Sequence, residues 1–138
     1  MRPITVTWDG GVRFTADIRG HKVSVDQPPQ GGGQDTAPMP LELLPASLGT
    51  CVALYVNRFL LTRGLDATGM RVEVATQAAS DPHRIARFDV AVTVPGGVPE
   101  KYRDALRRAA EGCTVHHSIT HGPRIEVSVL GAIPAAAQ

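Results

Sequence analysis

Hydrophobic and polar positions alternate along several stretches of the chain, and each of these stretches predicts a β-strand. A period of two is typical of a strand with one face buried. The stretches are residues 3–8, 12–18, 21–26, 70–79, 84–94 and 124–131. Asp9–Gly10–Gly11 separates the first two, and Gly20 is expected to make the next turn. We therefore expect an N-terminal antiparallel meander, a central antiparallel hairpin formed by 70–79 and 84–94, and a last strand near the C-terminus.

Residues 40–63 carry the strongest helical pattern. Apolar residues recur there at helical spacing, namely Leu44, Leu48, Cys51, Tyr55 and Phe59. Much of the remaining helix surface is apolar as well, which predicts a helix buried at the centre of the structure, with a dimer core as an attractive setting. Pro40 and Pro45 suit the first turn, and Arg63–Gly64 suits the end.

A second, amphipathic helix is predicted over residues 98–111, and a short one begins at Cys113. Gly112 separates the two. Helices and strands in this order predict an α+β fold with strands on both sides of a central helix. The length of 138 residues fits a single domain, 1–138.

Charge and composition disfavour some classes of function. The chain carries 14 basic and 13 acidic side chains, and only 4% of its residues are aromatic. Neither value favours binding to nucleic acid or to an anionic membrane surface. No signal peptide or membrane span is predicted, because the N-terminus lacks an apolar region and Arg58 and Arg63 interrupt the longest apolar stretches. We therefore expect a cytoplasmic protein.

Residues 27–38 are rich in proline and glycine and predict a loop. The triple glycine lacks the Gly-Lys-Ser/Thr ending of a phosphate-binding loop. A flexible connector or an active-site flap is the expected role.

The two cysteines are the main candidates for chemistry. In a reducing compartment a cysteine pair is more often catalytic or redox-sensing than a structural bridge. Cys51 lies on the apolar stripe of the central helix, so a buried, inert thiol is the alternative. Cys113 begins a helical segment, with Thr114 as a possible helix cap. About sixty residues separate the cysteines, and the spacing alone leaves open whether they meet.

A zinc site is a weaker alternative. Cys113 is followed by His116, His117 and His121 at zinc-like spacing. Adjacent histidines such as His116 and His117 often line a surface, which leaves the site without a firm fourth ligand, so we expect neither a metal nor another cofactor.

The motifs around the cysteines resemble those of the OsmC/Ohr family. Pro40 to Cys51 (PLELLPASLGTC) is similar to its first-cysteine segment, and Cys113 to His116 (CTVH) to its second-cysteine region. The order of elements agrees over nearly the whole chain, and the pattern is closer to the less characterised OsmC-like branch than to Ohr. The resemblance implies an intertwined homodimer, with antiparallel sheets around long central helices and two active sites at the interface.

The resemblance also implies a thiol-dependent peroxidase. The thiolate of Cys51 would be oxidised by an organic hydroperoxide to a sulfenic acid and would then form a disulfide with Cys113. A small dithiol or lipoyl-type reductant would restore both thiols. Family members add an arginine from the meander and a glutamate before the first-cysteine helix. Arg19 is the best match here, with Arg13 as its competitor, and Glu42 is the nearest glutamate.

The position of Glu42 also leaves a second function open. The glutamate of the Ohr branch directly follows the proline, where this chain has Leu41. Nine steps of about 100° would place Glu42 opposite Cys51 on a regular helix, unless Pro45 offsets its start. The alternative is a stress or small-ligand-binding protein that uses the same fold without significant peroxidase activity.

Overall fold

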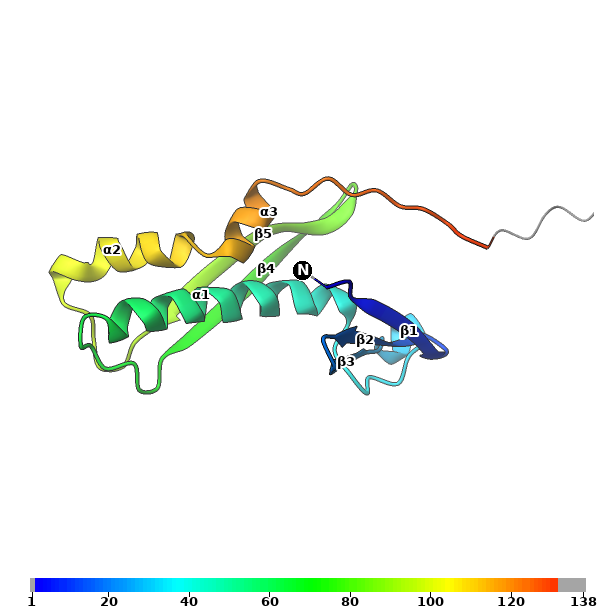
Figure 1. The fold of residues 1–138 in the computed structure, drawn as a ribbon, viewed down its shortest axis with the longest axis horizontal. Helices are drawn as coiled ribbons and strands as arrows, with labels where there is room; N and C mark the ends of the chain where they lie inside the picture. The colour runs from blue at the N-terminus through cyan, green and yellow to red at the C-terminus, as the bar shows by residue number, and fades with distance from the viewer. Residues whose placement is uncertain (1, 132–138) are drawn as a thin grey trace, which may run out of the picture.

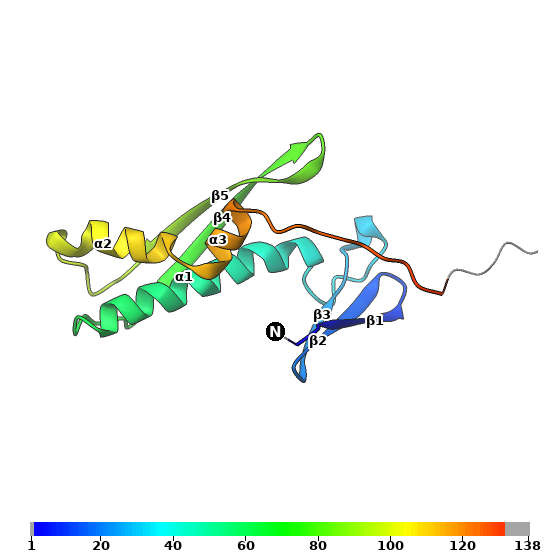
Figure 2. The same cartoon turned by 45° about the horizontal axis from the view of Figure 1, so that its top comes forward.

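The structure is a computed structural model that describes residues 2–131, and it has the predicted α+β architecture (Figure 1). A three-stranded sheet and a two-stranded sheet accompany three α-helices. Figure 2 shows the two-stranded sheet crossing one long helix, while the three-stranded sheet forms a separate lobe beyond the N-terminal end of that helix.

The N-terminal lobe is the predicted antiparallel meander. Its strands are β1 (Thr5–Gly10), β2 (Arg13–Ile18) and β3 (His21–Val25), in the order β1-β2-β3. The two-residue turn Arg19–Gly20 joins β2 to β3 with φ angles of 59° and 92°. Two positive φ values are typical of the tight hairpin turn whose twist matches that of the flanking strands, which explains glycine at its second position.

The predicted central hairpin is also present. Strands β4 (Arg71–Ser80) and β5 (His83–Thr93) pair antiparallel, with Val72 opposite Val92 and Val74 opposite Val90. These valines occupy every second position of their strands and point to the same face of the sheet, so the hairpin has one apolar face to bury.

Helix α1 (Leu43–Leu61) provides the surface that covers this face. A short 3₁₀ helix, η2 (Pro40–Glu42), leads into it, which places both prolines in the first turns as predicted. α1 packs against β4, β5, α2 (Glu100–Glu111) and α3 (Thr114–Thr120). The buried apolar core consists of Leu48, Val52, Val56, Phe59, Leu60 and Cys113. Five of these six residues belong to α1, which confirms its central position.

Loop 27–38 is more ordered than the flexible flap that the sequence suggests. It contains the 3₁₀ helix η1 (Pro29–Gly31) and is held by Asp26, which is completely buried. The carboxylate of Asp26 accepts hydrogen bonds from the backbone N–H groups of Gln27, Gln34 and Thr36 and from the Thr36 hydroxyl, at 2.7–3.2 Å. The Thr36 bonds contribute most to lowering the pKa of Asp26 to about 2. Gly33 lies so close that a Cβ atom there would overlap the Gln27 carbonyl oxygen.

The prediction of a last strand over 124–131 is wrong for the single chain. Residues 122–131 run away from the other elements without pairing with either sheet (Figure 1). Their apolar side chains stay exposed, including Ile125, Val127 and Val129 at 81–85%. The alternating pattern describes a segment able to form a strand, but a strand also requires a partner edge.

The helix that would come closest to spanning a membrane is the core helix itself. Pro40–Leu61 is long enough, with a mean hydropathy of 1.3 over its most apolar window. The core helix of a globular protein has the same length and composition, and here the segment packs against a sheet and two helices.

Candidate active site

Cys51 lies in the middle of α1, between the buried residues Leu48 and Val52. Its own side chain is only partly buried and its thiol is free. Partial exposure gives a small molecule access to the thiol, which a reactive cysteine requires.

Cys113 is completely buried and lies at the junction of α2 and α3. It is the N-cap residue of α3, and its Sγ atom accepts a hydrogen bond from the backbone N–H of His116 at 3.2 Å. The cap predicted for Thr114 is therefore made by the cysteine, and Thr114 is the first residue of the helix.

The fold brings the two cysteines together, which the sequence left open. Both pack in the same apolar cluster, and their side chains are close enough to interact. Burial raises the pKa of the Cys113 thiol above its ordinary value of 9.0, and the nearby Cys51 thiol raises it further. The hydrogen bond from His116 opposes this effect. Cys113 is therefore held as a neutral thiol beside Cys51 at neutral pH.

Arg19 and Glu42 lie elsewhere in the single chain. Arg19 is exposed in the β2–β3 turn, within the lobe beyond the N-terminal end of α1, and it makes no hydrogen bond or ion pair with any part of residues 2–131 (Figure 1). Arg13, its competitor, is exposed in the same sheet. The Glu42 carboxylate accepts a hydrogen bond from the backbone N–H of Met39 at 2.8 Å, so it caps the start of the helical segment.

The histidines after Cys113 stack on one another. His116 and His117 have ring centroids 5.8 Å apart at an interplanar angle of 19°. No group of three or more metal-ligating side chains occurs in the part of the chain that the structure describes. The spacing that resembled a zinc motif therefore does not bring a ligand set together there.

Sequence reasoning missed one polar contact at the site. The hydroxyl of Tyr55 lies 3.0 Å from the hydroxyl of Thr114. Tyr55 was part of the apolar stripe in the sequence pattern, and nothing in the pattern indicates that its polar end meets a residue 59 positions later.

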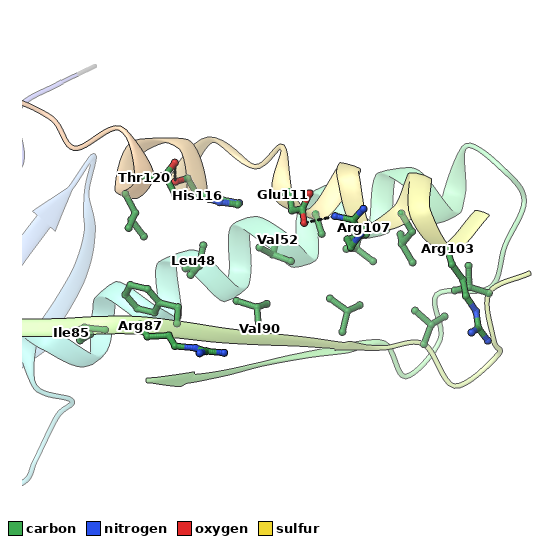
Figure 3. A pocket seen from close by; sticks show the side chains of 18 of the residues that line it. Leu48, Val52, Ile85, Arg87, Val90, Arg103, Arg107, Glu111, His116 and Thr120 are labelled. Atoms are coloured by element: carbon green, nitrogen blue, oxygen red, sulfur yellow. Dashed lines mark hydrogen bonds and ion pairs between the residues drawn. The ribbon is translucent and has the colours of Figure 1, made fainter. Parts of the chain in front are cut away.

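An open apolar groove of about 980 Å³ lies along α1 (Figure 3). Its walls come from α1, β5, α2 and α3, and residues such as Leu48, Val52 and Val90 form its apolar lining. Arg107 and Glu111 form an ion pair of 2.9 Å within its lining. Neither cysteine belongs to the lining, but Leu48 and Val52, which flank Cys51, do belong to it.

Comparison with known proteins identifies the family. The sequence profile of the family described as OsmC-like protein matches residues 32–128, which include both cysteines. The chain belongs to the OsmC-like protein family. No curated protein matches this OsmC-like chain.

Solved structures agree with this membership. A protein from Psychrobacter arcticus 273-4, named as an osmotic stress induced and detoxification response protein, is similar with a TM-score of 0.77, 26% identity and coverage of 86% of this chain and 88% of that chain. An OsmC like protein from Mycoplasma pneumoniae shares the fold with a TM-score of 0.72, 14% identity and 86% coverage of both chains. An organic hydroperoxide resistance protein from Elizabethkingia anophelis gives 0.65, 19% identity and coverage of 88% and 90%. The latter two show likeness of fold alone.

Proposed function

We propose that this OsmC-like protein is a thiol-dependent peroxidase that reduces organic hydroperoxides. The observation that carries the proposal is the meeting of Cys51 and Cys113 at one site, the first partly exposed and the second buried. In this proposal the peroxide reacts at the partly exposed Cys51, and Cys113 resolves the product. The Elizabethkingia anophelis protein named for organic hydroperoxide resistance shares the fold, which agrees with this chemistry.

Three steps complete the cycle. The Cys51 thiolate attacks one peroxide oxygen, the O–O bond breaks, and the alkoxide leaves as an alcohol after taking up a proton. The resulting Cys51 sulfenic acid condenses with the Cys113 thiol, so that an S–S bond forms, the S–OH bond breaks and water leaves. A small dithiol or lipoyl-type reductant then returns both thiols by exchange and becomes a disulfide itself.

A homodimer is part of the proposal. The single chain exposes 10459 Å², whereas a compact monomer of 14.6 kDa is expected to expose roughly 6,900 Å². Large apolar side chains contribute to this excess, among them Ile4, Val6, Trp8, Ile125 and Val127. Part of the excess comes from the unpaired segment 122–131, and exposed apolar side chains of this kind are typical of a surface that a second copy covers. Sedimentation equilibrium should therefore give twice the chain mass of 14.6 kDa; a monomer at micromolar concentration would contradict this part of the proposal.

Arg19 and Glu42 enter the proposal through that dimer. Neither lies at Cys51 within one chain, so Arg19 would have to reach the thiol of the second copy across the interface. There its guanidinium would stabilise the thiolate and the leaving oxygen. Glu42 would orient Arg19 once the interface forms.

The turnover assay is direct. Reduced protein, cumene hydroperoxide and dihydrolipoamide are mixed, and loss of peroxide is followed. Turnover that disappears in Cys51→Ser supports the proposal, whereas equal rates with and without protein would contradict it.

A second function is favoured by one observation. The Glu42 carboxylate is already bound to the Met39 backbone, and the shifted glutamate is the feature that separates this chain from the Ohr pattern. An OsmC-fold protein that binds a small apolar ligand without significant peroxidase activity is the alternative. Absence of turnover together with saturable binding of such a ligand would favour it.

A further inference from the structure

A hydrogen bond joins the two segments that carry the cysteines. The Tyr55 hydroxyl on α1 and the Thr114 hydroxyl at the start of α3 are 3.0 Å apart. Within residues 2–131, the other polar side-chain interaction between these two segments is the one between the Cys51 and Cys113 thiols; the remaining contacts of α1 with other helices and strands are packing contacts.

This bond lies directly beside the thiols. Tyr55 follows Cys51 by four residues, and residues four apart lie on the same face of a helix, one turn away. Thr114 directly follows Cys113. The bond therefore fixes the start of α3 against the same face of α1 that presents Cys51.

The attachment of α3 depends strongly on contacts at this point. The helix spans only Thr114–Thr120, and residues 122–131 after it do not pair with either sheet. Val115 and Ile119 pack against the apolar core, which holds α3 near α1 without fixing its exact register. A hydrogen bond supplies the directional constraint that apolar packing lacks.

We propose that Tyr55 and Thr114 form a positioning pair that holds Cys113 in the geometry for disulfide formation with Cys51. The inference rests on the proposed peroxidase function and concerns its second step. A disulfide requires the two Cα atoms within roughly 7 Å and a narrow range of dihedral angles. The first step involves Cys51 and the peroxide, so losing the pair slows the condensation and leaves sulfenic acid formation unchanged.

The size of the effect follows from one hydrogen bond. Such a bond changes a local equilibrium by roughly two- to tenfold. Tyr55→Phe and Thr114→Val should each slow disulfide formation by this factor, and the double variant should be no slower than the worse single variant, because the same bond is lost. Thr114→Ser keeps a hydroxyl and should restore the rate.

A single-turnover experiment separates the two steps. Reduced protein is mixed with one equivalent of cumene hydroperoxide, and samples are quenched with a sulfenic acid probe and read by intact mass. The expected result is an unchanged rate of peroxide loss and a longer-lived Cys51 sulfenic acid in Tyr55→Phe. Tyr102→Phe is the matched control, because it removes a tyrosine hydroxyl on α2 that makes no hydrogen bond within the described residues.

A second measurement keeps the inference testable if the protein is not a peroxidase. The equilibrium constant for the Cys51–Cys113 disulfide is measured against a glutathione redox buffer in the wild-type protein and in each variant. A two- to tenfold decrease in Tyr55→Phe and Thr114→Val, with recovery in Thr114→Ser, supports the positioning role even without peroxide turnover. Equal constants in wild type and variants would overturn it, as would a slowed peroxide step with an unchanged condensation step.

Discussion

The Sγ atom of Cys113 accepts a hydrogen bond from the backbone N–H of His116 at 3.2 Å, so the buried cysteine is itself the N-cap of α3. This arrangement ties the second thiol to the backbone and fixes the direction in which it points. Together with a weaker contribution from the Val115 backbone, it opposes the effect of burial on the pKa of this thiol in an apolar cluster.

Burial of Cys113 predicts a loss of folding stability in alkali. The pKa of this thiol is raised in the folded protein above its ordinary value of 9.0, mainly by burial. Below that value both states hold the proton and the free energy of unfolding is unaffected. As pH rises through the ordinary value, the unfolded state loses its proton first, and stability should fall by at most about 1.4 kcal/mol per pH unit until the folded pKa is reached.

Urea unfolding between pH 8 and 10.5 measures this dependence. Cys113→Ser is the control, since its hydroxyl keeps an acceptor for the His116 N–H and does not titrate in this range. Subtracting its profile removes the contributions of lysines and tyrosines. Identical slopes in both proteins would mean that the pKa of Cys113 is not raised.

The unequal burial of the two cysteines predicts unequal roles. Cys51→Ser should abolish peroxide reduction, because Cys113 is buried and held neutral. Cys113→Ser should react once with peroxide and then stop as a Cys51 sulfenic acid, which a sulfenic acid probe labels in proportion to protein. Labelling of Cys113 in the Cys51→Ser variant would reverse the assignment.

The separation of Arg19 from Cys51 predicts complementation between chains. Arg19→Ala and Cys51→Ser homodimers should each lose most of their activity. In a mixed dimer, one site would combine the intact Cys51 of the first chain with the intact Arg19 of the second, so activity should return to about half of the wild-type value per dimer.

Unfolding and refolding the two variants together, with differently tagged chains, would provide the mixed dimer. Arg13→Ala is the matched control. Its homodimer should be active without being mixed with a second variant. A mixed dimer no more active than its parents would show that the arginine does not act across the interface.

Asp26 is expected to stabilise the loop that leads into α1. Its pKa is about 2, chiefly because of hydrogen bonds from Thr36, so its contribution to stability is present above the ordinary value of 3.8 and is lost as pH falls toward 2. In Asp26→Asn, the amide N–H₂ would face the N–H and O–H donors that bind the carboxylate, so hydrogen bonds would be lost. Tm at pH 7 should therefore fall by roughly 5–10 °C. Asp35→Asn, in the same loop, should leave Tm unchanged, because none of the hydrogen bonds described for this loop involves the Asp35 side chain. Equal Tm values for the two variants would contradict this account.

The sequence predicted those elements whose residues alternate or recur with one apolar face. The hairpin β4–β5 and helix α1 bury these faces against each other, whereas the meander pairs as predicted but leaves Val6, Trp8 and Phe14 exposed in the single chain. The prediction of a last strand was wrong because alternation marks an apolar face but does not show whether a strand of the same chain is available to pair with it. The order of loop 27–38 was missed because it depends on a single buried carboxylate, which sequence periodicity does not register.

The candidate site, too, was predicted only in part from the sequence. Cys51 and Cys113 were identified from motifs and from residue type, but their meeting depends on how α2 and α3 pack against α1, and no local pattern encodes this. The Tyr55–Thr114 contact is a long-range polar pair inside an apolar pattern, so only the fold reveals it.

The central claim is that Cys51 and Cys113 form a peroxide-reactive pair, and intact mass spectrometry tests it most directly. Fully reduced protein is treated with one equivalent of cumene hydroperoxide, and free thiols and mass are measured before and after. The expected result is fast loss of both thiols together with the mass of two hydrogen atoms, absent from Cys51→Ser and Cys113→Ser. Reduced protein that keeps both thiols and its mass over minutes would contradict the claim.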